Sequence, residues 1–262
     1  MSKEKDRLVV LQGCKERRIN PTSILSHENN KDEYNPFLTL GLIRNDITDL
    51  IDLYDLFLNH TPTPKREISG YAGIQTGKTI YITRLIFSTL YEFFVFLEKS
   101  RDKLENNDLF TSILEEMSDE SFMQWKKYNT WANAIHGQIR VNKLNATKKE
   151  KLLLHIMRDT RMATFHYHSV ESKLREGFRL FFFQSNLKGS DFAYYSDDTN
   201  IQTDRSFYVD ASIDYGFSAD TETSLYKFGS DKFFIDALTD ITVFLNFILS
   251  KYHSKKLENI DK

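Results

Sequence analysis

The stretch KTIYITRLIFSTLYEFFVFLEKS, residues 78–100, decides the fold class of this 262-residue chain. Its apolar side chains recur every three or four residues and cover two adjoining faces of a helix. The polar remainder is a narrow strip made of Arg84, Ser88 and Glu92. Because such a helix must be covered by other elements, we predict that it lies at the centre of the fold.

The rest of the chain shows the same helical periodicity in four long segments and one short one. We expect the long helices at 36–60, 118–142, 147–174 and 231–252, and the short one at 108–116. Asn35 followed by Pro36 is a start signal, and Thr147 with Glu150 forms a capping box. We therefore predict an all-α fold, a four- to five-helix bundle.

The predicted bundle occupies residues 35–252 as a single domain. A polar arm precedes it at 1–34, and a short tail follows it at 253–262. Within the domain, residues 177–229 interrupt the helical periodicity, because they are rich in Phe and Tyr and contain turn sequences such as KGSD and SDDTN. We expect an irregular insertion there, with short strands as the alternative to loops.

The charge and composition of the chain exclude several classes of protein and of binding site. Lys and Arg total 35 against 37 Asp and Glu, so the net charge of −2 excludes a strongly basic nucleic-acid coat protein. The single cysteine, Cys14, excludes an internal disulfide and a cysteine-based zinc site. The two most apolar stretches, 85–97 and 241–249, are shorter than the roughly 20 residues of a membrane-spanning helix. We expect a soluble, cytoplasmic protein with no membrane partner.

The segment AGIQTGKT, residues 72–79, matches the phosphate loop of nucleotide-binding proteins. In such a loop the backbone amides bind phosphates, and the lysine reaches the β and γ oxygens. The preceding TPTPKREISGY lacks the pattern of the buried strand that a phosphate loop follows. We therefore interpret Lys78 as a residue at the start of a helix and expect no nucleotide cofactor.

The expected helix at 147–174 also carries a partial set of metal-binding residues. His155 and His166 lie on it, with Asp159 between them. The set lacks the HExxH spacing of a zinc helix, and a solvated helical face explains the pattern as well. We expect no bound metal.

The densest constellation is RDTRMATFHYH, residues 158–168, which contains two arginines and two histidines. A guanidinium is a permanent planar clamp for phosphate, and an imidazole titrates near neutral pH. Together they supply the fixed positive charge, acid and base that metal-independent phosphodiester cleavage requires. The alternative is structural: the arginines pair with Asp159 or Glu171, and the histidines pack at a helix interface.

Arg161 to His166 fits the R-x4–6-H motif of HEPN domains, and Phe165-His166-Tyr167 is similar to the FHY version of that motif. The resemblance implies a helical bundle that forms a homodimer. It also implies a metal-independent endoribonuclease of defence or toxin–antitoxin systems, with a cognate antitoxin or regulator as partner. In this resemblance His166 is the general acid or base, Arg161 clamps the phosphate, and Glu92 is a polar helper on the neighbouring helix.

The pairing of arginine and histidine stays open. On a regular helix Arg161 and His166 are about 140° apart, whereas His168 lies on nearly the same face as Arg161. Arg158 is separated from His166 by seven residues, beyond the spacing of the motif. A symmetric dimer resolves the 140° offset, since each histidine then faces the arginine of the other subunit.

RNA is the partner that the resemblance and the local charge indicate. Four lysines precede the arginines, at positions 143, 148, 149 and 151, and attract a phosphate backbone weakly. A solvated helix start explains the same lysines. The second hypothesis is a non-catalytic helical interaction protein whose Arg/His helix forms an interface.

Overall fold

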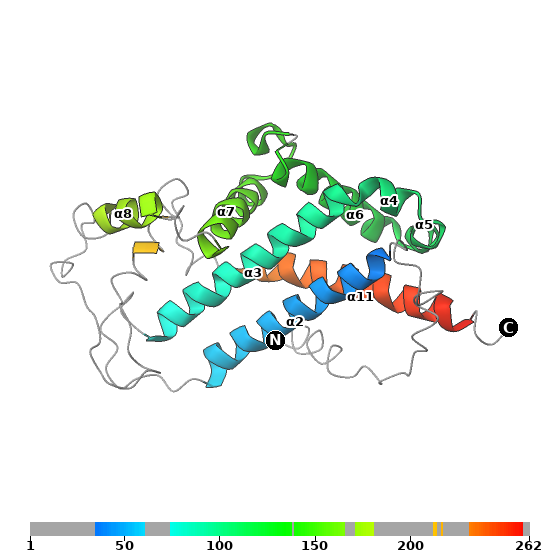
Figure 1. Ribbon diagram of the computed structural model, residues 1–262, viewed down its shortest axis with the longest axis horizontal. Helices are drawn as coiled ribbons and strands as arrows, with labels where there is room; N and C mark the ends of the chain where they lie inside the picture. Colours follow the sequence, from blue (N-terminus) through cyan, green and yellow to red (C-terminus); the bar gives the residue numbers. More distant parts are fainter. Residues whose placement is uncertain are drawn as a thin grey trace, which may run out of the picture.

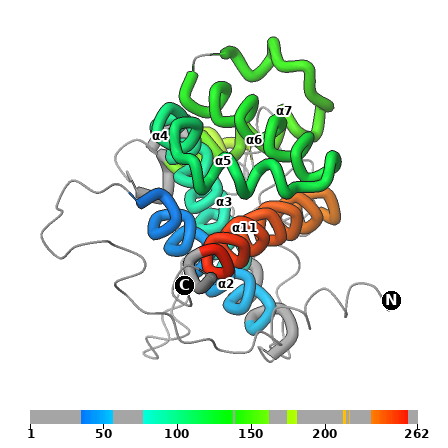
Figure 2. The backbone as a smooth tube through the Cα atoms, turned by 90° about the vertical axis from the view of Figure 1, so that its right-hand side faces the viewer, coloured from blue at the N-terminus to red at the C-terminus, as the bar shows by residue number. Residues whose placement is uncertain are grey.

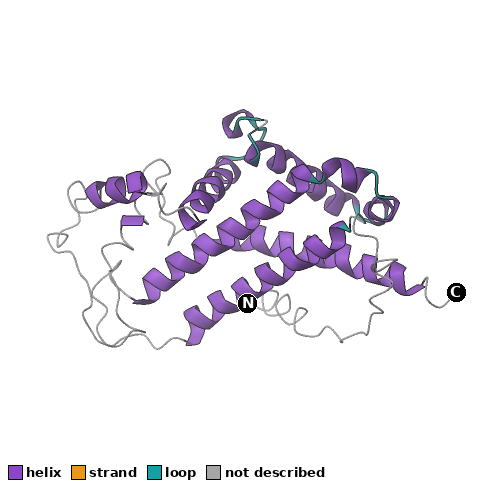
Figure 3. Ribbon diagram, viewed as in Figure 1, coloured by secondary structure: helices purple, strands orange, loops and turns teal. Residues whose placement is uncertain are grey.

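The computed structural model describes residues 35–60, 74–137, 139–165, 171–180, 212–213, 216 and 231–258. Every regular element in these residues is a helix, which confirms the all-α fold class (Figure 3). The long helices are α2 (Pro36–His60), α3 (Ile74–Lys99), α6 (Asp119–Ile135), α7 (Lys148–Phe165) and α11 (Lys232–Glu258). The shorter ones are α4 (Arg101–Glu105), α5 (Asp108–Glu115), the 3-10 turn η2 (Val141–Lys143) and α8 (Glu171–Arg179). This part of the chain thus holds more helices than the four or five we predict for the bundle.

Helix α3 is the central element, as its apolar circumference predicts. It packs against α2, α6 and α7, and its side chains Ile82, Phe87 and Phe93 are fully buried. Figure 1 shows α3 (cyan) running diagonally through the middle of the molecule. In Figure 2, α6 and α7 lie on one side of it, and α2 and α11 on the other. The covering helices therefore remove the apolar faces of α3 from water.

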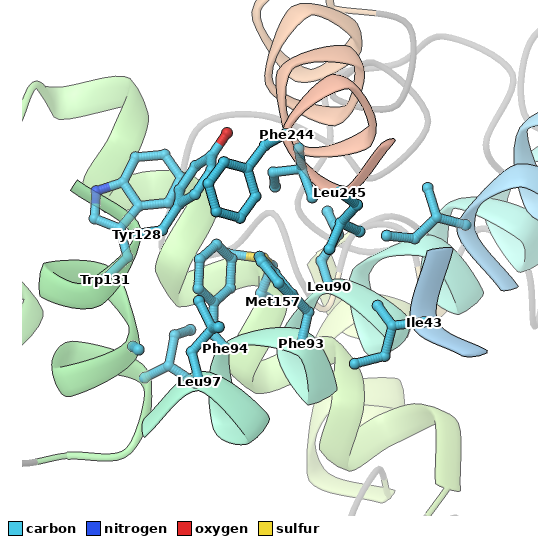
Figure 4. Close-up of a cluster of buried hydrophobic side chains, with 14 of the residues drawn as sticks. Ile43, Leu90, Phe93, Phe94, Leu97, Tyr128, Trp131, Met157, Phe244 and Leu245 are labelled. Carbon is cyan, nitrogen blue, oxygen red and sulfur yellow. The ribbon is translucent and has the colours of Figure 1, made fainter. Parts of the chain in front are cut away.

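Aromatic side chains form the core where α3, α6 and α11 meet (Figure 4). The ring of Phe244, from α11, stacks on Trp125 with centroids 5.6 Å apart and meets the edge of Tyr128 at 5.4 Å. Phe94 of α3 contacts Tyr128 and Trp131 at 6.0 and 5.8 Å. Tilted and edge-to-face pairs of this kind add to the free energy of apolar burial.

Helices α2 and α11 run antiparallel and are joined by polar and aromatic contacts. The ring of Phe37 stacks on Tyr252 at 4.0 Å, and Arg44 Nε donates a hydrogen bond to Asn246 Oδ1 at 2.8 Å. The end of α11 is tied to the residue after α5, because Lys251 and Lys255 both pair with Glu116. These two ammonium groups hold the pKa of Glu116 at about 2, below its ordinary value of 4.5.

The helix boundaries follow local signals more closely than the apolar period. The capping box is confirmed: Thr147 N donates to Glu150 Oε2 at 2.8 Å, and Glu150 N donates to Thr147 Oγ1 at 3.2 Å. The single helix expected at 118–142 is wrong at its end. Helix α6 stops at Ile135, and Gly137 then takes a φ of +88°, a backbone conformation that favours glycine.

Several expected segments lie partly or wholly outside the described residues. The arm at 1–34 lies wholly outside, and so does most of the insertion at 177–229. The helix expected at 147–174 corresponds to α7 and α8, and residues 166–170 between them are not described. The tail expected from 253 is helical to Glu258 as part of α11.

Gly177 marks a close approach between α8 and the described part of the insertion. A Cβ atom at this position would overlap the carbonyl oxygen of Ser212 and the backbone of Gly216. Ser212 and Ile213 are themselves buried. Glycine is required here because only a residue without a side chain permits this packing.

Two helical stretches are long and apolar enough to cross a membrane by length and composition, Gly77–Lys99 in α3 and Lys232–Lys255 in α11. The fold buries 56% of the apolar 18-residue window in the first stretch and 39% of that in the second. Both are longer than the apolar stretches seen in the sequence, so length alone does not exclude a membrane span. The central position of α3 accounts for its hydropathy, since core helices of soluble proteins have the same composition.

We predict that Phe94→Ala lowers the free energy of unfolding by about 3–5 kcal/mol, because it leaves a cavity beside Tyr128 and Trp131. Urea unfolding of the full chain, followed by circular dichroism, measures this loss. The matched control is Met123→Ala, which removes a side chain that is 62% exposed and changes stability by at most about 0.5 kcal/mol. Equal losses in the two variants would contradict the central core.

Candidate functional site

The structure brings together two predicted site residues that are far apart in the sequence. Arg161 lies near the end of α7, and Glu92 lies on α3. Arg161 Nε donates to Glu92 Oε1 at 3.0 Å. The contact forms because α7 packs along α3, and Glu92 belongs to the narrow polar strip of that central helix.

A tyrosine that the sequence analysis did not single out completes this cluster. The guanidinium carbon of Arg161 lies 5.6 Å from the centroid of the Tyr91 ring. Arg161 is thus held on one side by a carboxylate and on another by an aromatic face, an arrangement that suits arginine. Tyr91 is the neighbour of Glu92 in the sequence, but only the approach of α7 shows that its ring meets the arginine.

The cluster is open to solvent. The side chain of Arg161 is 29% exposed and that of Glu92 is 48% exposed. A phosphate group can therefore reach the guanidinium without a rearrangement of the core. The guanidinium is planar and permanently charged, and its contact to Glu92 is made by the Nε donor.

Arg158 occupies a different position from Arg161. Its Nε lies 3.6 Å from Asp159 Oδ1, and its side chain is 46% exposed. The structural alternative, in which an arginine pairs with Asp159, therefore describes Arg158. Because this pair is exposed on one helix, its contribution to stability is small.

The two histidines of the motif, His166 and His168, lie outside the described residues. Helix α7 is described to Phe165, the residue before the first of them. The choice between the two histidines, and their angle to Arg161, stays a prediction. The described part of the candidate site consists of Tyr91, Glu92, Arg158 and Arg161.

The AGIQTGKT match ends within α3. Gly77, Lys78 and Thr79 lie within α3, which begins at Ile74, so this end of the AGIQTGKT match is helical. Thr79 is buried against the core.

The partial metal-binding set has His155 on α7. His155 lies beside Asn142, with His155 Nε2 and Asn142 Oδ1 3.3 Å apart. Among the described residues, no group of three or more His, Cys, Asp and Glu side chains is arranged to hold a metal ion.

Comparison of the chain with protein-family models, curated proteins and solved structures finds no match.

We predict that the Arg161–Glu92 pair contributes little to stability. A double-mutant cycle with Glu92→Gln, Arg161→Gln and the combined variant gives a coupling energy of about 0.2–1 kcal/mol, as expected for partly exposed ion pairs. Urea unfolding measures it. A coupling energy above about 2 kcal/mol would contradict this prediction and make the pair a structural clamp between α3 and α7.

Proposed function

We propose that this protein is a metal-independent endoribonuclease that resembles HEPN enzymes and acts in the cytoplasm. The proposal is supported by the Arg161–Glu92 contact, which orients the arginine of the R-x4–6-H motif, five residues before His166 in the sequence. A surface arginine held by a carboxylate and an aromatic ring is preorganised, so little conformational entropy is lost when it binds phosphate.

The proposed chemistry uses only side chains of this chain. His166 takes the proton of a ribose 2′-hydroxyl, and the resulting oxygen attacks the adjacent phosphorus. The bond to the 5′-oxygen breaks, that oxygen takes up a proton, and a 2′,3′-cyclic phosphate remains. Arg161 stabilises the charge that develops on the phosphate oxygens, and Glu92 holds its guanidinium in place. Arg158 provides a second, more exposed cation, and His168 is the second candidate for the proton transfer.

The alternative function is a non-catalytic interaction protein, for which the Arg/His helix is a contact surface. The contact between Arg158 and Asp159 is the pairing that this alternative predicts. The two functions differ in one measurable property, namely whether a histidine of the motif is required for RNA cleavage. A biological role in defence or in a toxin–antitoxin system, with an antitoxin or regulator as partner, belongs to the enzymatic proposal.

We predict that the purified protein cleaves RNA in the presence of EDTA. His166→Ala should lower the cleavage rate by at least about 100-fold, the size of a typical general acid–base contribution. His155→Ala is the matched control, because it removes a histidine that lies on α7 and contacts Asn142. Gel analysis of a labelled RNA measures the rates, and far-ultraviolet circular dichroism verifies the fold.

Two results would contradict the enzymatic proposal. One is cleavage that persists unchanged in both His166→Ala and His168→Ala. The other is cleavage that requires added magnesium or manganese. Full activity of His168→Ala together with loss in His166→Ala would assign the proton transfer to His166.

We further predict a symmetric homodimer in which the α7 helices lie near the twofold axis. Each subunit then offers its histidine to the arginine of the other, which resolves the 140° offset on a single helix. Light scattering at micromolar concentration should give about twice the 30.8 kDa mass of one chain. An active protein that is strictly monomeric would show that one chain builds the whole site.

A further inference from the structure

The turn between α6 and α7 is folded back onto α7, and Asn142 makes polar contacts across this packing. Lys151 Nζ donates to the backbone oxygen of Asn142 at 3.2 Å, and His155 Nε2 lies 3.3 Å from Asn142 Oδ1. The positive φ of Gly137 allows the chain to leave α6 in this direction. As a result, Lys143 lies next to a residue that contacts α7, and the turn adds positive charge beside that helix.

Helix α7 carries basic side chains on the face that receives this turn. Lys148, Lys151 and Arg158 project within about 80° of one another on a regular helix. Arg140, Lys143, Lys148 and Arg158 are exposed, and Lys151 is half-buried. We call these five residues, Arg140, Lys143, Lys148, Lys151 and Arg158, the basic strip.

Among the described residues, most of the strip has no carboxylate partner, although Arg158 contacts Asp159, whereas two neighbouring lysines are paired with carboxylates. Lys127 pairs with Glu150 at 2.7 Å, and Lys149 pairs with Asp231 at 3.5 Å. In the part of the chain that the structure describes, the four residues of the strip before Arg158 form no ion pair with a carboxylate. The strip is therefore a local positive surface on a chain whose net charge is −2.

We propose that the basic strip binds the phosphate backbone of single-stranded RNA and leads it along α7 to Arg161. This inference rests on the proposed function, because it names the part of the substrate that the site takes. From Lys148 to Arg161 the helix rises about 20 Å, which is long enough to contact several phosphates of a single strand. A linear row of cations on one helix fits the backbone of a single strand.

An anionic membrane is the other polyanion that such a strip attracts, and the surface favours RNA. Binding to a bilayer requires exposed apolar side chains in addition to positive charge. Between residues 139 and 161, whose side chains the structure describes, Ile139 is the one large apolar residue that is exposed, at 38%. More exposed apolar side chains, such as Leu42 and Val243, lie on α2 and α11.

The test measures binding of a fluorescent 12-nucleotide uridine RNA to the full chain by anisotropy, in EDTA and 50–200 mM KCl. All proteins carry His166→Ala, so that cleavage plays no part. The strip variant is Lys143→Ala/Lys148→Ala, and the control is Lys99→Ala/Lys103→Ala. The control removes the same number of positive charges from the end of α3 and from α4, which Figure 1 shows away from α7. Circular dichroism verifies the fold of each variant.

We predict that the strip variant binds about 25-fold more weakly at 100 mM salt. Its plot of log affinity against log salt should be shallower by about 1.4, because each lost phosphate contact removes about 0.7 from the slope. The control should keep the affinity within about twofold. Equal losses of RNA affinity in the two variants would overturn the proposal that the strip binds RNA. So would the absence of RNA binding by the parent His166→Ala protein. A third contrary result is that the strip variant loses binding to anionic lipid vesicles but keeps its binding to RNA.

The experiments distinguish a failure of the basic-strip proposal from a failure of the nuclease proposal. RNA binding through the strip without cleavage by the wild-type chain would refute the nuclease and support the strip. If the wild-type chain cleaves RNA and the strip variant binds and cleaves RNA equally well, the nuclease is supported and the strip is refuted.

Discussion

Helix α3 requires cover on almost every side, and this requirement organises the molecule. It has 26 residues, and its apolar faces would otherwise meet water along their whole length. Helices α2, α6 and α7 pack directly against it, and α11 reaches it through aromatic side chains such as Phe234, which lies 4.8 Å from the ring of Phe87. Chain segments distant in sequence are therefore neighbours because they share one surface to bury.

The candidate site lies where this cover is incomplete. Within the polar strip of α3, Ser88 is buried and donates its hydroxyl hydrogen to the backbone oxygen of Arg84 at 2.8 Å, whereas Glu92 remains half exposed. The fold tolerates Glu92 at that position because its side chain is both partly exposed to water and paired with Arg161. The same packing that buries α3 thus leaves one carboxylate at the edge of α7, where it orients an arginine.

Local signals predicted the fold well, and long-range contacts were harder to foresee. The bounds of α2 at 36–60 agree with the structure, since Asn35, Pro36 and the helical period all indicate them. The end of α6 was missed because the apolar period continues to Ile139 and outweighs a single glycine at 137. The sequence indicates a functional role for Glu92 only through a family resemblance. It indicates no role for Tyr91 or Asn142, because their contacts depend on how α7 and the turn pack. Residues 166–168 were singled out from the sequence alone.

The aromatic core also gives the protein a built-in optical reporter. The chain has two tryptophans, Trp125 and Trp131, and both lie buried on α6 within the cluster shared with α3 and α11. Their emission therefore reports whether these three helices are packed together. Arg161 and its tyrosine neighbour contribute no indole to that signal, so a ligand bound at the end of α7 can leave it unchanged while unfolding of the core alters it.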